Sequence, residues 1–250
     1  MITRNYFKIV RVFPDPSDYF YIKNEGYESG NLYVDCPDER TDIEFKIDNG
    51  SWTNLHQTYG AGAYIELQPN SKVYFRGTAG YVKDVEGNGL WFDSGINTNI
   101  TISMGGDLRT LLNYTDVDSI TTIPEKCFQN AFDGTNLISI DNLTLGSSVT
   151  TIGNNAFAMM FQGSQIQNGL DLSNVTSVGD YGLSQLYYNC NNLTSAYAPN
   201  LSTWNTSKTN SWLDGVASTG VLYKPANLTI PTNNEGGVPS GWTTQTYPQA

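Results

Sequence analysis

The single histidine of the chain, His56, and several pairs of acidic residues are the side chains whose types could support catalysis or metal binding. His56 lies in the polar stretch NLHQTYG with no serine or cysteine nucleophile motif nearby, so we expect a surface-loop histidine. The acidic pairs match no EF-hand or other spaced calcium motif, and we expect them in solvated turns. They are Asp15 with Asp18, Asp38 with Glu39, and Asp116 with Asp118. We therefore predict no catalytic residue, no metal site and no cofactor.

Aromatic side chains could also do chemistry, because exposed rings stack on the faces of sugars. The chain holds 16 Tyr, 5 Trp and 10 Phe. Tyr188, Tyr197, Trp204 and Trp212 lie close together in sequence, and we expect most of these rings to be packed beneath the C-terminal segment. A bound glycan should contact the solvent-facing strand positions and the rings beside them. The candidate ligand-binding residues are Thr144, Asp171, Tyr197 and Trp204.

The composition of the 250-residue chain favours a protein rich in β-structure. Apolar residues make up 39% and charged residues 15%, whereas about a quarter of the residues in an average soluble domain are charged. Asn, Thr, Ser and Gly replace the missing charged residues, and these four types favour turns over helix interiors. We therefore expect a mainly β fold.

Charge, cysteine spacing and the start of the chain exclude several classes of partner. The formal net charge is -11 and the pI is about 4.3, so nucleic acid and acidic membrane surfaces should be repelled. Cys36, Cys127 and Cys190 form no CxxC pair, which favours reduced, buried thiols. The start MITRNYFKIV lacks the apolar region of a signal peptide, and no stretch has membrane-spanning length. We expect neither a secretion leader nor membrane insertion.

Three segments in the second half of the chain align without gaps and define a repeat. They are CFQNAFDG at 127–134, AFAMMFQG at 156–163 and GLSQLYYN at 182–189. One column of the alignment holds Phe128, Phe157 and Leu183, and another holds Phe132, Phe161 and Tyr187. Four residues before each segment stands an Ile or Val, namely Ile123, Ile152 and Val178. The spacings of 29 and 26 residues predict a solenoid.

Each repeat offers one helical turn and one short strand, too little to bury an apolar face alone. Apolar residues at i, i+3 and i+4 in 157–161 predict a short helical turn. Gly163 stands where the end of a helix needs a left-handed residue, and Asn189 can adopt the same conformation. The alternating pieces LTL at 143–145 and LDL at 170–172 predict half-buried strands. Stacking of the repeats should then create the core.

The pattern T-x-[IV]-x3-[apolar]-F-x2-[apolar]-[FY]-x-G, followed by an apolar strand, resembles the BspA-like leucine-rich repeat. This family forms right-handed solenoids in Bacteroidales surface proteins and in gut bacteriophages, the crAss-like and related Bacteroidales phages among them. The stretch 212–245, with GVASTG and GVPSGW, resembles the C-terminal module of such phage proteins, and FKIDNGSWTNL and SKVYFRG resemble the β-domain before their repeats. The chain departs from the family in having only about three repeats, and in the third Gly182 replaces a Cys or Ala. A short array suggests a structural or docking element.

The first hundred residues show strand-like runs separated by turn signals instead of a repeat. The runs are YFKIVRVF, DYFYIK, NLYVDC, DIEFKI, AYIELQ, KVYFRG, GLWFD and NITISM. The stretch DNGS at 48–51 is the strongest hairpin signal, because Asn-Gly adopts the positive φ angles of a tight turn. This many short strands in such a length predict a β-sandwich.

The predicted organisation has three parts. They are a β-sandwich docking domain at 1–103, a leucine-rich-repeat solenoid at 104–228 and a C-terminal capping segment at 229–250. A short helix from Asp107 should cover the first end of the solenoid, because solenoid ends need covers. The repeats are expected near 121–149, 150–175 and 176–202.

Three functional hypotheses follow. The resemblance implies a non-enzymatic virion protein of a bacteriophage, such as a head fibre, capsid decoration or tail-associated protein, assembled in the host cytoplasm. Its partners would be other virion proteins and a host-surface glycan or protein, and a homo-oligomer fits this role. The alternative is a Bacteroidales cell-surface or secreted adhesin, which should carry a signal sequence. The third hypothesis, a polysaccharide depolymerase, lacks a catalytic constellation. We therefore expect a virion protein that binds and does not catalyse.

Overall fold

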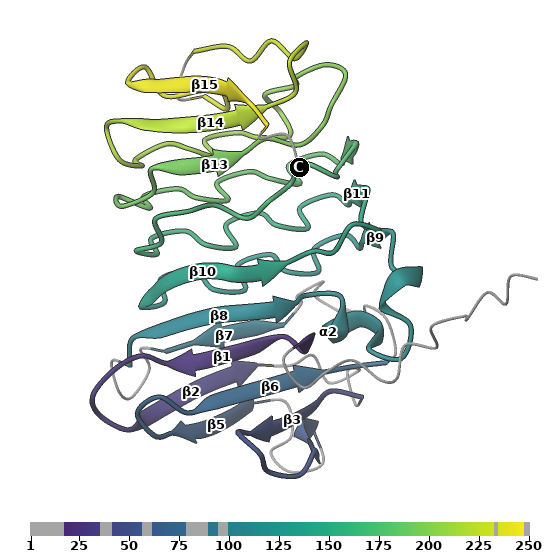
Figure 1. Ribbon diagram of the computed structural model, residues 1–250, viewed down its shortest axis with the longest axis vertical. Helices are drawn as coiled ribbons and strands as arrows, with labels where there is room; N and C mark the ends of the chain where they lie inside the picture. The colour runs from purple at the N-terminus through teal and green to yellow at the C-terminus, as the bar shows by residue number, and fades with distance from the viewer. Residues whose placement is uncertain are drawn as a thin grey trace, which may run out of the picture.

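A computed structural model describes residues 18–35, 42–56, 62–78, 90–94, 100–232 and 235–247. The chain forms a long column, with the N-terminal strands at one end and the C-terminal strands at the other (Figure 1). The mainly β class is confirmed, and much of the column is a β-solenoid of about 5 turns. No helix in the described ranges is long and apolar enough to cross a membrane.

A six-stranded sheet forms one wall of the N-terminal end and continues into the solenoid. Antiparallel pairing joins β1 (Tyr21–Asn24) to β6 (Lys72–Arg76) and β8 (Ile102–Asp107), whereas β8 and β10 (Leu137–Thr144) run parallel. The step from β8 to β10 is therefore where antiparallel pairing gives way to stacked rungs. The strand order is β10 (Leu137–Thr144), β8 (Ile102–Asp107), β1 (Tyr21–Asn24), β6 (Lys72–Arg76), β3 (Glu44–Ile47) and β4 (Thr53–Asn54).

A second sheet has three strands and packs against the first through aromatic rings. Its order is β5 (Gly62–Leu67), β2 (Gly30–Asp35) and β7 (Trp91–Asp93). Buried residues alternate with more exposed ones along β2 and β5, because successive side chains of a strand point to opposite faces. The ring of Phe92 on β7 lies 5.4 Å from that of Phe75 on β6 and 5.8 Å from that of Phe20. These contacts give the two sheets a common core.

The hairpin predicted at 48–51 is present, but its left-handed residue differs from the prediction. β3 pairs with β4 across this turn. Asp48 has a φ of 46°, while Asn49 and Gly50 keep ordinary φ angles, and the Gly50 N–H donates to the Ile47 carbonyl at 2.8 Å. The Asp48 carboxylate also accepts the Lys72 N–H at 2.8 Å. This bond to β6 explains why Asp48, and not the Asn49-Gly50 pair, adopts the left-handed conformation of the turn.

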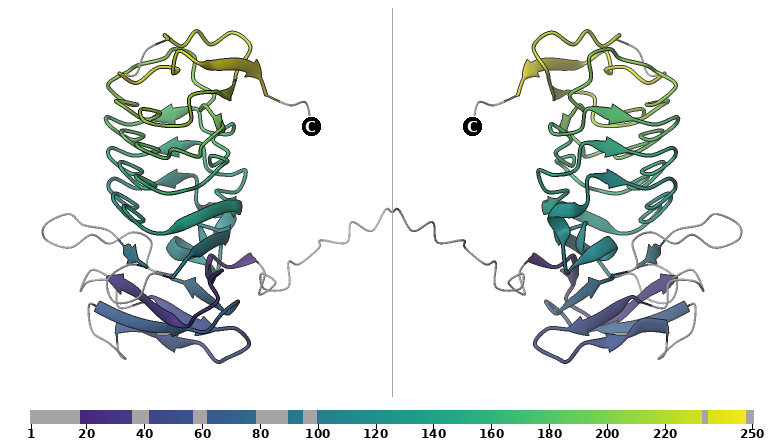
Figure 2. Two further views of the ribbon diagram at one scale, coloured as in Figure 1. Left: turned by 90° about the vertical axis from the view of Figure 1, so that its left-hand side faces the viewer. Right: turned by 90° about the vertical axis from the view of Figure 1, so that its right-hand side faces the viewer.

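The predicted alignment of the repeats is confirmed by a parallel sheet on one side of the solenoid. Its strands, one per rung, are β9 (Thr122–Ile123), β11 (Thr151–Ile152) and β12 (Ser177–Val178). Ile152 pairs in register with both Ile123 and Val178, and all three are buried. Figure 2 shows these rungs from the side as a stack of similar coils.

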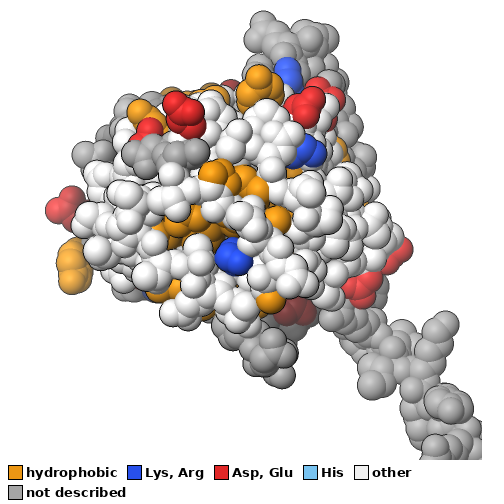
Figure 3. Space-filling model, turned by 90° about the horizontal axis from the view of Figure 1, so that it is seen from above, with side chains coloured by type: hydrophobic (Ala, Val, Ile, Leu, Met, Phe, Trp, Pro, Cys, Tyr) orange, Lys and Arg blue, Asp and Glu red, His pale blue; other side chains and the backbone are white. Residues whose placement is uncertain are grey.

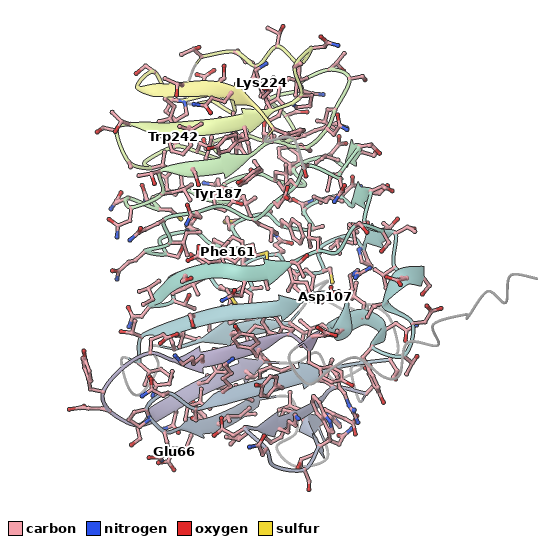
Figure 4. The ribbon with its side chains drawn as sticks, viewed as in Figure 1. Glu66, Asp107, Phe161, Tyr187, Lys224 and Trp242 are labelled. Atoms are coloured by element: carbon pink, nitrogen blue, oxygen red, sulfur yellow. The ribbon has the colours of Figure 1, made fainter. Side chains whose placement is uncertain are left out.

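One column predicted from the sequence, that of Phe132, Phe161 and Tyr187, forms a continuous stack of rings inside the solenoid. The centroid of the Phe161 ring lies 6.1 Å from that of Phe132 and 5.9 Å from that of Tyr187, with interplanar angles of 18° and 9°. Phe161 and Tyr187 lie in successive rungs (Figure 4). Phe132 also stacks on Phe92 at 4.9 Å, so the column of rings runs on into the N-terminal sheets.

The helical turn predicted for 157–161 is wrong. Left-handed residues recur at every fourth position here, and a right-handed helix cannot contain them. In the second rung they are Asn155, Met159 and Gly163. Every second N–H group closes a tight turn within the rung, as the Met160 N–H does by donating to the Phe157 carbonyl at 3.2 Å. The N–H groups between them donate to the next rung, as the Phe161 N–H does to the Leu186 carbonyl at 3.1 Å. The apolar i, i+3, i+4 spacing therefore comes from a ribbon of turns, although Gly163 is left-handed as expected.

The solenoid has about 5 turns, where the sequence predicted about three repeats. A parallel sheet runs through the later rungs, formed by β13 (Ser195–Tyr197), β14 (Gly220–Lys224) and β15 (Trp242–Thr246). The Tyr187 N–H donates to the Trp212 carbonyl at 3.0 Å, which continues the bonding between rungs. At the end of the column beyond β15, apolar side chains gather in the centre, surrounded mainly by uncharged polar groups (Figure 3).

A buried ion pair fixes the junction between the N-terminal sheets and the first rung. The helix expected from Asp107 begins later, as α2 (Thr110–Asn113), because β8 extends to Asp107. The guanidinium of Arg109 donates to the Asp107 carboxylate at 2.6 Å and to the Ser148 hydroxyl at 2.7 Å. A buried charge is stable only when it is paired. Arg109 therefore holds the chain around 148 against β8, and one hydrophobic core runs through the junction.

Candidate binding face

The strand side of the solenoid carries one outward side chain from each rung. β10 supplies Thr144, and Asp171 follows between the buried Leu170 and Leu172. In the later rungs Tyr197, Tyr223 and Gln245 pair in register on β13, β14 and β15. We call these five side chains the binding face; they are Thr144, Asp171, Tyr197, Tyr223 and Gln245.

Thr144 and Asp171, both predicted as ligand-binding residues, lie together at one pocket. Its volume is about 90 Å³. Pockets for whole small ligands occupy roughly 300 to 1,000 Å³, so this one can take only a single substituent of a larger ligand. The lining residues are Thr144, Leu145, Gly146, Ser147, Val149, Asp171, Asn174 and Val175.

Tyr197, the third predicted residue, lies next to Asp171 and stacks on Tyr223. The two ring centroids are 4.9 Å apart and the planes differ by 22°. Partial burial raises the pKa of Tyr197, and the nearby Tyr223 and Asp171 raise it further. Tyr197 is therefore neutral at physiological pH, with a hydroxyl that can both donate and accept hydrogen bonds.

A ladder of polar side chains runs beside the binding face and ties successive rungs together. The Ser195 hydroxyl donates to the Asn168 side-chain oxygen at 2.8 Å, and the Asn168 amide donates to the Asp141 carboxylate at 2.9 Å. Ser139 donates to the same carboxylate at 3.0 Å. These side-chain bonds link successive rungs along this part of the wall.

Trp204, the fourth predicted residue, lies away from the binding face. Its indole N–H donates to the Gly236 carbonyl at 2.8 Å, and its ring packs 5.2 Å from that of Trp212. Trp212 is fully buried and donates to the Gly237 carbonyl at 2.9 Å. Both indoles hold the segment around 236 onto the last rungs, as the packing interpretation of these rings predicted.

Sequence reasoning missed Tyr223 and the rim residues Ser147 and Asn174. The signal for Tyr223 was available, because VLYKP at 221–225 has the same alternation as LTL and LDL. Tyr247 was missed as well: its hydroxyl donates to the Ala198 carbonyl, and burial raises its pKa. This hydrogen bond holds Tyr247 at the edge of the wall, next to the residue that follows Tyr197.

The other titratable residues do not form a reactive cluster in the described ranges. No group of three or more His, Cys, Asp or Glu side chains there could hold a metal ion. Asp118 pairs with Arg109 at 3.1 Å, and His56 is half-buried. Cys127 and Cys190 are buried, and burial raises the pKa of the Cys190 thiol to about 11. The remaining residues of interest, Asp15, Cys36, Asp38 and Glu39, lie outside the described residues.

Comparisons with protein-family models, curated proteins and solved structures found no match to this chain. A carboxylate, several hydroxyls and a tyrosine stack on a fixed wall can hydrogen-bond a polar ligand and contact its apolar surface at the same time.

Proposed function

We propose that this protein is a non-enzymatic binding component of a bacteriophage virion, and that its binding face holds a glycan or protein of the host surface. The observation that carries the proposal is the row of outward side chains on successive rungs, from the exposed Thr144 and Asp171 to the half-buried Tyr197 and Tyr223. Solenoids use such extended surfaces to recognise ligands longer than a pocket can enclose.

The rigidity of the wall supports a binding role. Every rung donates backbone hydrogen bonds to the next, and the rings behind the face are stacked and buried. A face that is already ordered loses little conformational entropy when a ligand binds. The free energy of each weak contact then contributes to binding and is not offset by the cost of ordering the protein.

The virion assignment rests on the resemblance to BspA-like leucine-rich repeats of gut phages. In this proposal the strands of the two N-terminal sheets that precede residue 104 form the β-sandwich docking domain at 1–103, which attaches the protein to other virion proteins. Residues 229–250 cap the solenoid. The same architecture would serve the alternative, a Bacteroidales cell-surface or secreted adhesin, which differs in location and not in the binding face.

Two measurements test the proposal. Mass spectrometry of purified particles from the source should detect the chain in the virion; its presence only in the bacterial envelope would favour the adhesin. Labelled protein should bind host cells, and the double variant Tyr197→Ala, Tyr223→Ala should lose at least about tenfold in affinity, or ~1.4 kcal/mol. Asp180→Ala, an exposed change on another side of the rung, is the matched control. Equal binding by all three proteins would contradict the role of the face.

A further inference from the structure

The pocket between Thr144 and Asp171 combines an apolar floor with a polar rim. Leu145, Val149 and Val175 form the floor and are 4%, 0% and 1% exposed. The rim carries exposed side chains with hydrogen-bonding groups, which are Thr144, Ser147, Asp171 and Asn174. The pocket therefore suits a small group that has both a methyl-sized apolar end and polar atoms.

The rim can accept a hydrogen bond from one donor group of a ligand, and it can donate a hydrogen bond to one acceptor group of the same ligand. One carboxylate oxygen of Asp171 accepts the Ser173 N–H at 2.8 Å, so the second oxygen can accept a hydrogen bond from a ligand. The Thr144 hydroxyl oxygen accepts the Gly146 N–H at 2.9 Å, and its own proton can be donated to a ligand. Asn174 adds an amide, which can donate as well.

We infer that this pocket binds the acetamido group of an N-acetylhexosamine in a surface glycan, an inference that rests on the proposed function of the face. The acetamido methyl packs on Leu145 and Val175. Its N–H donates to the Asp171 carboxylate, a charge-assisted bond. Its carbonyl oxygen accepts from Thr144 or Asn174, so all polar atoms of the group are satisfied.

The size of the pocket supports this assignment over a whole sugar ring. A volume of about 90 Å³ is several times the roughly 10 to 15 Å³ that one water molecule needs. That space holds the few heavy atoms of an acetamido group, and the pyranose ring lies outside, against the wall that leads to Tyr197.

Charge restricts the sugar to a neutral one. The Asp171 carboxylate stands on the rim, Asp141 lies farther along the same wall, and the chain carries a formal charge of -11. A uronic or sialic acid would bring its carboxylate within a Debye length of about 8 Å of Asp171 and be repelled. The ligand class is therefore a neutral, N-acetylated hexose.

Ligand-observed NMR and calorimetry with simple glycosides test the inference. The probes are the methyl glycosides of N-acetylglucosamine and N-acetylgalactosamine, compared with methyl glucoside, which lacks the acetamido group. We expect at least one N-acetylated probe to bind at least about tenfold tighter than methyl glucoside, or ~1.4 kcal/mol. Asp171→Ala, which removes the acceptor, and Ser147→Phe, which fills the pocket from an exposed position, should abolish this difference. Asp180→Ala, an exposed change of the same type on another side of the rung and outside the pocket, should retain it.

Equal affinity of wild-type protein for acetylated and non-acetylated probes, or no binding of either, would overturn the inference. So would wild-type selectivity in Asp171→Ala and Ser147→Phe. The proposed function fails separately. It would be refuted, with the pocket assignment left standing, if wild-type protein binds the probes but does not bind host cells and the chain is not detected in purified particles. Host-cell binding that is unchanged in both pocket variants would sustain the proposed function and refute the acetamido site as its basis.

Discussion

The N-terminal sheets and the solenoid both bury aromatic rings, but they arrange them differently. Between the sheets, Phe92 meets Phe20 and Phe75 at interplanar angles of 56° and 71°. Along the solenoid, Phe161 lies nearly parallel to both of its neighbours, at 18° and 9°. In the sheets each strand has its own set of partners, whereas each rung reproduces the positions of the rung before it. A core contact in the solenoid is therefore repeated, and one in the sheets is unique.

The two regions are not separated, because Phe92 stacks on Phe132 at 4.9 Å with an interplanar angle of 7°. The predicted domain boundary at 103/104 falls inside β8 (Ile102–Asp107), which pairs with strands of both regions. We expect the described core to unfold in one cooperative transition, and the following variants measure how strongly each region contributes.

The largest effect is expected from Phe161→Ala, in the middle of the stack of rings. The side chain is fully buried, and its removal leaves a cavity between Phe132 and Tyr187. We expect a loss of about 3 to 5 kcal/mol in the free energy of unfolding, measured by urea titration. Tyr27→Ala is the control, because Tyr27 is 99% exposed and should change stability by less than about 0.5 kcal/mol. Two separate transitions in Phe161→Ala, with the sheets unaffected, would contradict a shared core.

Arg109→Ala tests the junction between the two regions. Without the guanidinium, the Asp107 carboxylate stays buried. Residue 109 then offers it a single donor, the backbone N–H. The expected cost is about 3 kcal/mol, at the lower end for a broken buried pair. Lys23→Ala, which breaks the more exposed pair with Glu25, should cost about 1 kcal/mol or less. Similar losses in the two variants, measured in the same denaturant titration, would show that the junction has no special role.

Gly163→Ala tests the ribbon of turns, which the N-terminal sheets lack. Gly163 has a φ of 71°, and a Cβ added there would meet no atom closer than 4.0 Å. The cost is therefore backbone strain alone, about 1 kcal/mol. Gly163→Asn should cost less, because Asn189 occupies the same column with a φ of 59°. Thermal denaturation can rank the variants, and an Ala variant as stable as the Asn variant would argue against strain at this column.

The smallest effect on stability is expected from ionisation of the Cys190 thiol, which occurs only at alkaline pH. This thiol is buried beside the Ser164 hydroxyl, at 3.3 Å. Burial raises its pKa from 9.0 to about 11, so between these values the folded protein binds more protons than the unfolded chain. Stability contributed by the neutral thiol is complete below about pH 9 and is lost as the pH rises through about 11. The unfolding free energy of wild-type protein should therefore fall more steeply over this range than that of Cys190→Ala. Parallel curves would mean that the thiol keeps its usual pKa when folded.

Side-chain periodicity was enough to predict the register of the central rungs and part of the binding face. Ile123, Ile152 and Val178 pair as aligned, and alternation at 143–145 and 170–172 placed Thr144 and Asp171 outward. These predictions succeeded because burial of alternate residues depends on side-chain type, which the sequence displays directly.

Backbone conformation and the later rungs could not be predicted in the same way. The i, i+3, i+4 spacing is shared by a helix and by the ribbon of turns, and residues such as Met159 adopt positive φ without any Gly or Asn signal. The rungs that carry β14 and β15 replace the Phe columns with other packing, including the Trp212 indole. Trp204 was placed on the binding face because ring type alone does not show which carbonyl an indole N–H will reach.

The ribbon of turns restricts how this chain can change in length during evolution. Along this ribbon, successive backbone N–H groups donate in turn to the local turn and to the neighbouring coil. A single inserted or deleted residue would exchange these two sets of donors, so every later hydrogen bond in that coil would lose its acceptor. Length differences must then collect at the corners, where spacings of 29 and 26 residues are already tolerated, or come as whole coils. The protein can be lengthened by duplication far more easily than by small insertions.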